Sequence, residues 1–101
     1  MAWVKVGSRE SVSAGKAKEF MVNGKRIAVF NVNDKYYATE ALCRHQDGPL
    51  AAGTLTGEIV ECPWHFWHYN VKTGELLDYL KGVKLTTYST EVRDNDIYID
   101  T

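Results

Sequence analysis

The sequence predicts an all-β protein, an antiparallel β-sandwich with two loops side by side at one end. Short runs of apolar residues are separated by turn residues about every eight to twelve positions, as in sandwiches and small barrels. The sharpest turn signal is Asn23-Gly24, since both residues accept a positive φ and form a two-residue hairpin turn. Residues 12–20 are the only candidate helix before residue 40, and they lack an apolar repeat at helical spacing.

The first expected strand covers residues 3–6, where apolar and polar residues alternate as in a half-buried strand. We expect Trp3 to pack in the core. Residues 7–10 break the strand, and a linker through residues 13–15 leads to the next element.

A hairpin is expected to join residues 19–22 to residues 25–32 through the Asn-Gly turn. A two-residue turn pairs Val22 with Lys25, and side chains then alternate between the two faces of the sheet. We expect one face to be buried, and it holds Phe20, Val22, Ile27 and Val29.

The remaining strands are expected where apolar, β-branched and aromatic residues recur between turns. Asn33 and Asp34 form a turn into a third strand, and Pro63 ends the strand before Cys62 because proline has no N–H to donate. The expected strands after that turn are 35–39, 58–61, 68–70, a return at 75–78, and a closing hairpin of 84–92 and 97–100.

Composition limits the chain to one domain and excludes several partners. With 101 residues there is room for one modest core, so we expect a single domain over residues 1–101. The 12 basic and 13 acidic residues nearly cancel and are scattered, which argues against nucleic acid. No apolar run approaches the roughly 18 residues of a membrane span. We therefore expect a cytoplasmic monomer that does not bind membranes.

Two short segments carry the chemistry, Cys43-Arg44-His45 and Cys62-Pro63-Trp64-His65. They use both cysteines and two of the three histidines. By chance this spacing would occur on the order of once in a thousand such chains. One thiolate and one imidazole from each segment would suit a tetrahedral metal or an iron–sulfur cluster better than a hard cation.

Two other interpretations of these four residues stay open on spacing alone. They can be two ordinary buried thiols with two surface histidines, or they can close a structural Cys2His2 zinc site. Colour separates zinc from a cluster, because zinc is spectroscopically silent. The third histidine, His68, fits neither pair and is interpreted as a strand residue.

From Cys43 to Tyr69 the chain resembles the Rieske family, whose signature is C-x-H, a gap of about sixteen residues, and C-x-x-H. The resemblance implies a [2Fe–2S] cluster with Cys43 and Cys62 on one iron and His45 and His65 on the other. It also implies a Rieske-like sandwich, with a base of residues 1–39 and 75–101 and a small cluster-binding subdomain of residues 40–74.

The resemblance implies an electron carrier rather than an enzyme. Rieske-type oxygenases carry a much longer domain with a mononuclear iron, for which this chain has no room, and no catalytic triad or phosphate loop is evident. We expect a ferredoxin that takes electrons from a flavin-containing ferredoxin reductase and passes them to a terminal oxygenase or similar enzyme. The alternative is a small Rieske-type subunit of a larger oxidoreductase such as nitrite reductase.

Residues around the ligands bear on the reduction potential. High-potential family members carry a disulfide between the loops and a Ser and a Tyr that donate to sulfur. By motif position Gly48 and Trp64 replace the two cysteines, Trp67 replaces the Ser, and Tyr69 matches the Tyr. Fewer donors to sulfur lower the potential, so we expect roughly −150 to +100 mV.

One departure from the family pattern concerns the residue after His65, which is usually Gly and here is Phe66. A side chain there resists positive φ, so the loop backbone is expected to differ. Gly48 and Pro49 are expected to form a turn that shapes the site. An apolar rim that excludes water or docks a partner is expected from Pro49, Leu50, Trp64, Phe66 and Trp67.

Overall fold

The computed structural model describes residues 3–43, 48–64, 67–78 and 82–101. It measures 40 × 26 × 18 Å along its principal axes. Nine strands and two 3-10 turns make up the regular structure of these residues, and none of their helices could cross a bilayer. The elements are β1 Trp3–Ser8, η1 Arg9–Ser11, β2 Ala17–Val22, β3 Lys25–Val32, β4 Lys35–Glu40, η2 Leu50–Ala52, β5 Thr54–Thr56, β6 Ile59–Glu61, β7 His68–Asn70, β8 Thr87–Arg93 and β9 Asp96–Asp100.

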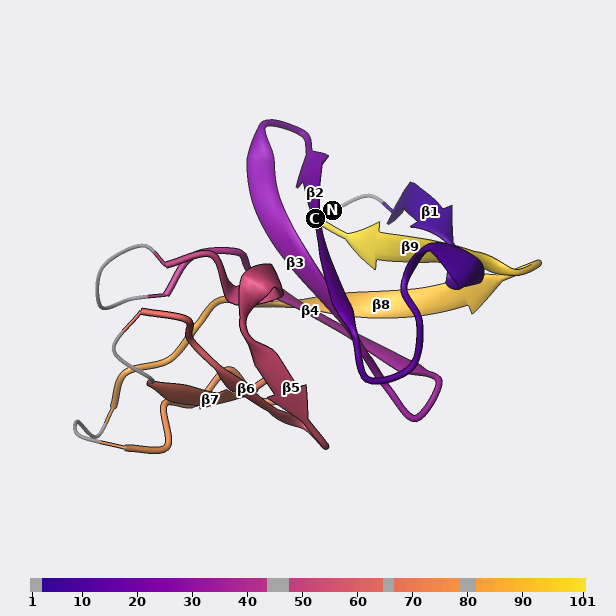
Figure 1. The fold of residues 1–101 in the computed structure, drawn as a ribbon. Coiled ribbons are helices and arrows are strands. Elements are labelled where there is room, and N and C mark those ends of the chain that lie inside the picture. Colours follow the sequence, from indigo (N-terminus) through magenta and orange to yellow (C-terminus); the bar gives the residue numbers. More distant parts are fainter. Residues whose placement is uncertain (1–2, 44–47, 65–66, 79–81) are drawn as a thin grey trace.

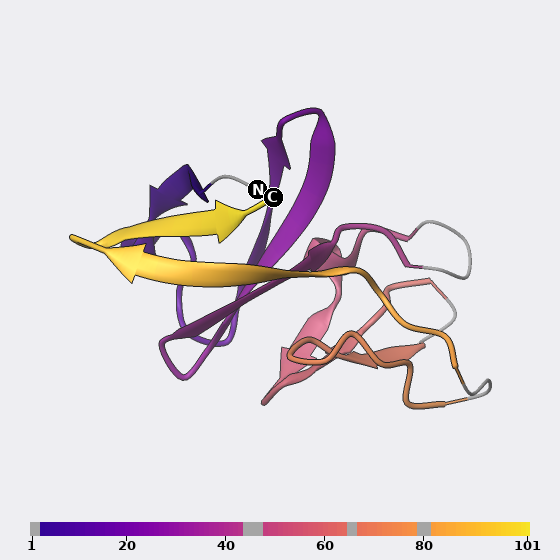
Figure 2. The ribbon, with the colours of Figure 1, turned by 180° about the vertical axis from the view of Figure 1, so that it is seen from behind.

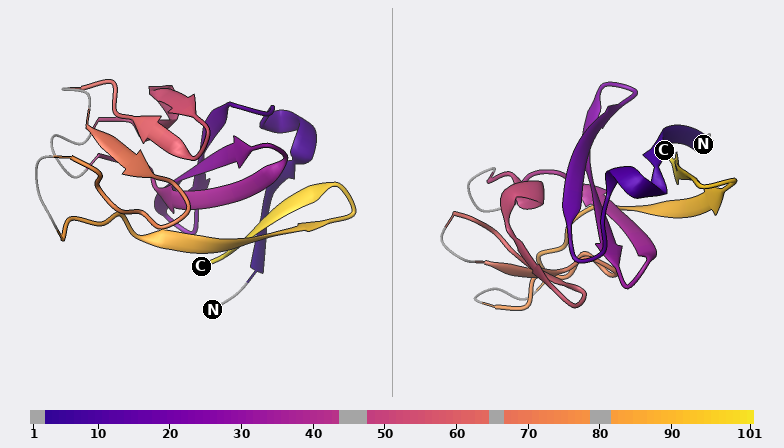
Figure 3. Two further views of the ribbon diagram at one scale, coloured as in Figure 1. Left: turned by 90° about the horizontal axis from the view of Figure 1, so that it is seen from below. Right: turned by 45° about the vertical axis from the view of Figure 1, so that its right-hand side comes forward.

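All strand pairs are antiparallel and belong to two sheets. The larger sheet has the order β1-β9-β8-β4-β3-β2, and the smaller has the order β5-β6-β7. The small sheet lies at one end of the molecule, and β1 and β9 lie toward the other (Figure 1), also when seen from behind (Figure 2) and from two further directions (Figure 3). The predicted antiparallel all-β fold is confirmed.

The first hairpin forms as its turn chemistry predicts. Asn23 and Gly24 adopt φ of 50° and 78°, the left-handed region that a two-residue hairpin turn requires. The register pairs Val22 with Lys25 and continues along the full length of β2. Of the predicted apolar face, Phe20 is partly buried and the others are fully buried.

Strand β3 is buried on both faces, which goes beyond the one buried face that was predicted. Ile27 and Val29 face a core that also contains Ile97 and Ile99 of β9. The neighbouring residues point the other way, into a second core. An uninterrupted apolar run, here residues 27–30, is the sequence signal of a strand covered on both sides.

The second core joins the large sheet to the small one. Ala28 and Phe30 of β3 enter it from one side, and Val60 and Tyr69 of the small sheet enter it from the other. Its buried members are Ala28, Phe30, Ala41, Cys43, Leu50, Val60, Cys62, Tyr69, Val71, Leu76 and Leu85. Both cysteines therefore belong to the same packed cluster as the central strand.

Two expectations about the second half of the chain need correction. Residues 75–78 do not form a strand and make only single bridges, such as Tyr69 with Leu76. The closing hairpin is confirmed, but its first strand begins at Thr87 rather than at residue 84. Its turn is narrower than expected, with positive φ at Asp94 and Asn95.

The expectation that Trp3 packs in the core is wrong. Its side chain is 39% exposed, whereas Val4 and Val6 pack against the first core. Successive side chains of a strand point to opposite faces, so Trp3 lies on the outer face when the valines point inward. There the Arg93 guanidinium lies 5.5 Å from the Trp3 ring centre and 5.1 Å from that of Tyr98.

Replacing Ile27 by alanine tests the burial of β3 in the first core. Because Ile27 is fully buried in the first core, Ile27→Ala should lower the free energy of unfolding by about 2–5 kcal/mol. Met21 on the adjacent strand is 67% exposed, and Met21→Ala should change it by less than about 0.5 kcal/mol. Urea unfolding followed by circular dichroism measures both, and equal losses would contradict the assignment.

Candidate metal centre

The first loop follows strand β4, and its described ends are joined by backbone pairing. The N–H of Cys43 donates to the carbonyl of Gly48 at 2.8 Å, and Leu42 and Pro49 form an isolated antiparallel bridge. This pairing fixes the backbone that carries the Cys43 side chain. His45, the predicted second donor of this loop, lies outside the described residues.

The second loop is closed in a similar way after strand β6. The N–H of Cys62 donates to the carbonyl of Trp67 at 2.7 Å, which joins the two described ends of the loop. The strand ends before Pro63, as the missing proline N–H predicts. His65 and Phe66 lie outside the described residues.

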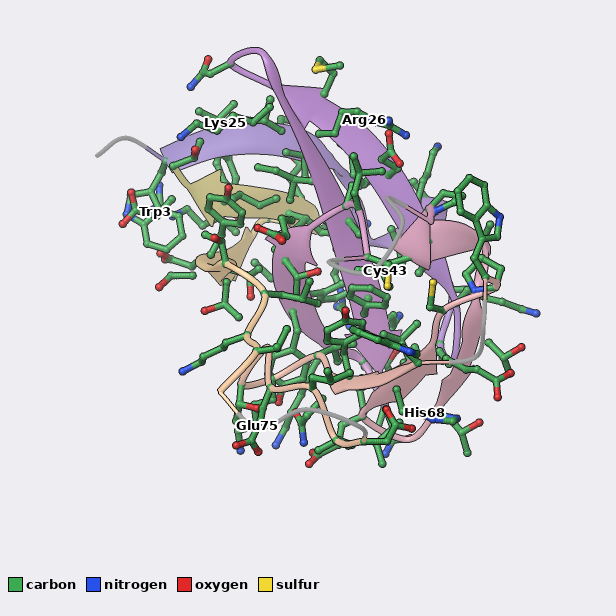
Figure 4. All side chains as sticks on the ribbon, turned by 90° about the vertical axis from the view of Figure 1, so that its left-hand side faces the viewer. Trp3, Lys25, Arg26, Cys43, His68 and Glu75 are labelled. Carbon is green, nitrogen blue, oxygen red and sulfur yellow. The ribbon has the colours of Figure 1, made fainter. Side chains whose placement is uncertain are left out.

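The two thiols are buried side by side. Cys43 is 1% exposed and Cys62 is fully buried, and neither is in a disulfide. Burial and, to a lesser extent, the hydrogen-bonded thiol of Cys43 raise the pKa of the Cys62 thiol to about 11, although the Trp64 backbone N–H acts in the opposite direction. Figure 4 looks at the end of the molecule that carries the loops, with Cys43 near its centre.

Tyr69 lies against the first of these sulfurs. Its fully buried hydroxyl is 3.3 Å from the Cys43 sulfur. Tyr69 pairs with Val60 in the small sheet, and this register directs its side chain inward toward the loops. Once Cys43 is a thiolate, it can only accept, so the hydroxyl would donate to sulfur.

Gly48 and Trp64 meet between the two loops. A Cβ atom at Gly48 would lie 2.8 Å from the Cys62 sulfur and 3.2 Å from Cγ of Trp64, closer than side-chain carbons normally come. Glycine is therefore required for the first loop to approach the second. The indole of Trp64 remains 48% exposed.

The other residues expected at the rim divide into two kinds. Leu50 is fully buried and belongs to the core rather than to the surface. Pro49 is half-buried at the start of η2, and Trp67 is partly buried against the second core. Of the described members of the expected apolar rim, Trp64 is thus the most exposed.

The arrangement of the thiols fits a bound metal centre. A thiol with a pKa of about 11 stays protonated at neutral pH, so a nearby cation is needed to hold it as a thiolate. Among the described residues no group of three or more His, Cys, Asp and Glu side chains could hold a metal ion. Two cysteinates supply half of the predicted set, and both remaining donors lie outside the described residues.

His68 forms a separate polar cluster beside the second loop. Its Nδ1 is 2.6 Å from Oδ2 of Asp78, and its Nε2 is 3.1 Å from Oε1 of Glu61. The hydrogen bond to Asp78, followed by the contact with Glu61, raises the pKa of His68 above its ordinary value. Sequence reasoning placed His68 on a strand but missed both partners; the only signal was the pairing of Glu61 with His68 across β6 and β7.

The profile of one protein family matches most of this chain. The Rieske [2Fe-2S] domain matches residues 2–89. The chain therefore belongs to the Rieske [2Fe-2S] family. Membership implies a [2Fe–2S] cluster as the cofactor, in place of the single zinc ion that the motif spacing left open.

The particular relatives are ferredoxins of oxygenase systems. The chain is 34% identical to Ferredoxin CarAc of Metapseudomonas resinovorans over 98 residues, which cover 96% of this chain and 92% of the relative. It is 29% identical to the biphenyl dioxygenase ferredoxin subunit of Pseudomonas sp. strain KKS102, covering 99% and 93%. Both relatives are ferredoxins by name, and the second is a subunit of a dioxygenase.

Solved structures agree with these relatives. One chain of a solved complex of reduced oxygenase and oxidized ferredoxin in carbazole 1,9a-dioxygenase matches with a TM-score of 0.87 at 34% identity. The match covers 96% of this chain and 91% of that chain. It matches the carbazole 1,9a-dioxygenase ferredoxin of Nocardioides aromaticivorans IC177 with a TM-score of 0.90 at 26% identity, covering 98% and 97%. A nitrite reductase small subunit matches with a TM-score of 0.86 at 20% identity, which shows the fold alone.

Adding a methyl group at Gly48 should push the two loops apart. Because the new carbon would overlap the Cys62 sulfur, Gly48→Ala should cost about 1–3 kcal/mol in stability and lower the iron bound per chain. Gly57→Ala is the matched control, since Gly57 has a φ of 59° and open space around it, at a cost of about 1–2 kcal/mol. Iron analysis after reconstitution checks this, and full iron content in Gly48→Ala would refute it.

The raised pKa of His68 predicts a pH-dependent contribution to stability. A group whose pKa rises on folding stabilises the fold fully below its unfolded pKa of about 6.5, and this contribution is lost as pH rises through the folded pKa. The stability difference between wild type and His68→Gln should therefore be largest at about pH 5.5–6.5 and smallest near pH 9. Urea unfolding of both proteins in the lower pH range and near pH 9 measures this stability difference. A difference that grows with pH would contradict the assignment.

Proposed function

We propose that this chain is a one-electron carrier of the Rieske-type ferredoxin class, with Cys43 and Cys62 on one iron and His45 and His65 on the other. The observation that carries the proposal is the pair of buried thiols brought together by two loops. Each thiol belongs to a segment with a histidine at ligand spacing. The family supplies the cofactor to which this donor set is assigned.

The residues around the thiols would serve electron transfer in distinct ways. When bound, the cluster supplies one-electron reduction, at a higher potential than an all-cysteine cluster because histidine ligands add no negative charge. Tyr69 would donate a hydrogen bond to the Cys43 sulfur and so favour the reduced state. Gly48 and Trp64 leave no disulfide between the loops, which supports a potential of roughly −150 to +100 mV.

The partners we propose are a flavin-containing ferredoxin reductase as the electron donor and a terminal oxygenase as the acceptor. The solved complex of an oxygenase with a 34% identical ferredoxin supports the acceptor. The ferredoxin relatives support a carrier that is not itself a catalyst, and we propose that it acts as a monomer. Using both cysteines as ligands leaves none for a secretory disulfide, which supports a cytoplasmic location.

The alternative is a small subunit that stays bound to a larger oxidoreductase such as nitrite reductase. The ferredoxin relatives at 29–34% identity cover nearly the whole chain, so they favour the carrier. Stable co-purification with a large enzyme, rather than transient exchange of electrons, would favour the subunit.

Spectroscopy of ligand variants tests the proposed function. The purified protein should be coloured, and after reduction with dithionite it should give a rhombic electron paramagnetic resonance signal of low average g. His45→Ala, His65→Ala and either cysteine-to-serine variant should lose colour and signal, because the cluster loses a ligand. His68→Gln is the matched control among the three histidines and should keep both.

The carrier role needs a further measurement. A flavin-dependent ferredoxin reductase with reduced nicotinamide should bleach the visible bands, and air should restore them over repeated cycles. A colourless, zinc-containing protein would refute the cluster assignment, and a coloured protein that no reductase or dithionite reduces would refute the carrier.

A further inference from the structure

The polar cluster of Glu61, His68 and Asp78 has no role in the proposed ligand set. Its side chains are 38%, 38% and 31% exposed, so it lies at the surface without being fully solvated. Asp78 accepts twice from the same residue, from Nδ1 at 2.6 Å and from the His68 backbone N–H at 3.1 Å. Glu61 completes the cluster on the other side of the ring at 3.1 Å.

This geometry suits a charged imidazole. When both carboxylates are ionised they only accept hydrogen bonds, so a ring with a carboxylate at each nitrogen donates from both. Only the imidazolium carries two N–H groups. The cluster therefore holds one positive charge between two negative ones, and the raised pKa of His68 agrees with this assignment.

The polar cluster is connected to the proposed metal centre through neighbouring residues of β6 and β7. Glu61 pairs with His68 across β6 and β7, and Cys62, the next residue, closes the second loop by its bond to Trp67. On the other side of His68 is Tyr69, whose hydroxyl lies 3.3 Å from the Cys43 sulfur. Because side chains alternate along β7, Tyr69 points inward to the sulfur while His68 points outward to the two carboxylates.

We propose that His68, held as an imidazolium between Glu61 and Asp78, raises the reduction potential of the cluster by its positive charge without being a ligand. The inference rests on the proposed function, because it needs a cluster bound by the two loops. Reduction adds a negative charge, which a nearby cation stabilises and a nearby carboxylate opposes. Since His68 and Asp78 are partly exposed, solvent and salt reduce the effect of the charge but do not remove it.

Three variants separate charge from structure. His68→Gln leaves both carboxylates and should lower the equilibrium constant for reduction two- to tenfold, about 20–60 mV at 59 mV per factor of ten. Glu61→Gln keeps an oxygen that accepts from Nε2 but removes a negative charge, so it should raise the constant by a similar factor. The double variant restores the net charge and should return toward the wild-type value.

The signs of these shifts decide the question. If His68 acted only by holding the loop in place, both single variants would shift the potential in the same direction and the double variant would not restore it. Lys5→Gln is the control for loss of a positive charge, because Lys5 pairs with Asp96 across the β1–β9 edge, away from the loops (Figure 1). It should leave the potential unchanged.

Potentiometric titration at pH 7, followed by visible absorbance at low and high salt, measures these shifts, which should shrink as salt is added. Nuclear magnetic resonance of the His68 ring protons provides a second readout and should show an imidazolium at pH 7. A neutral ring at pH 7, or coloured variants whose equilibrium constants for reduction lie within twofold of the wild-type value, would overturn the inference. A colourless wild type would instead refute the proposed function, so the two failures are distinguishable.

Discussion

Burial of strand β3 on both faces is the constraint on which the rest of the structure depends. Ile27 and Val29 hold the β9 hairpin on one side, while Ala28 and Phe30 hold the small sheet and the two loops on the other. A strand that contacts two cores cannot shift its register by one residue without exchanging every side chain between them. The position of the loops relative to the large sheet is therefore set by packing.

The proposed metal centre extends that packing, and its electrostatics follow from it. Cys43, Cys62 and Tyr69 are buried in the same cluster as Phe30, and burial makes a free thiolate at Cys62 unfavourable. A bound cation compensates that cost, so metal binding and loop order should be coupled. Charged side chains that influence the proposed metal centre then lie outside the second core, as His68 and its two carboxylate partners do.

Much of the fold could be predicted from local chemistry. The Asn23-Gly24 turn and the register of the first hairpin follow from positive φ and a two-residue loop, and both are confirmed. The errors came where a contact with a distant segment decides the outcome. Trp3 is exposed because its strand turns the valines to the core, and residues 75–78 form no strand because their pairing is limited to single bridges.

The sequence by itself determined the kinds of donor, their spacing and the family, because a ligand motif is written in residue types a few positions apart. Only the tertiary structure decided that Gly48 lies against the Cys62 sulfur, and that Glu61 and Asp78 enclose His68. The physical reason is that contacts between separate segments depend on how the two cores bring them together. Spacing along the chain carries little information about the distance between such segments in the folded protein.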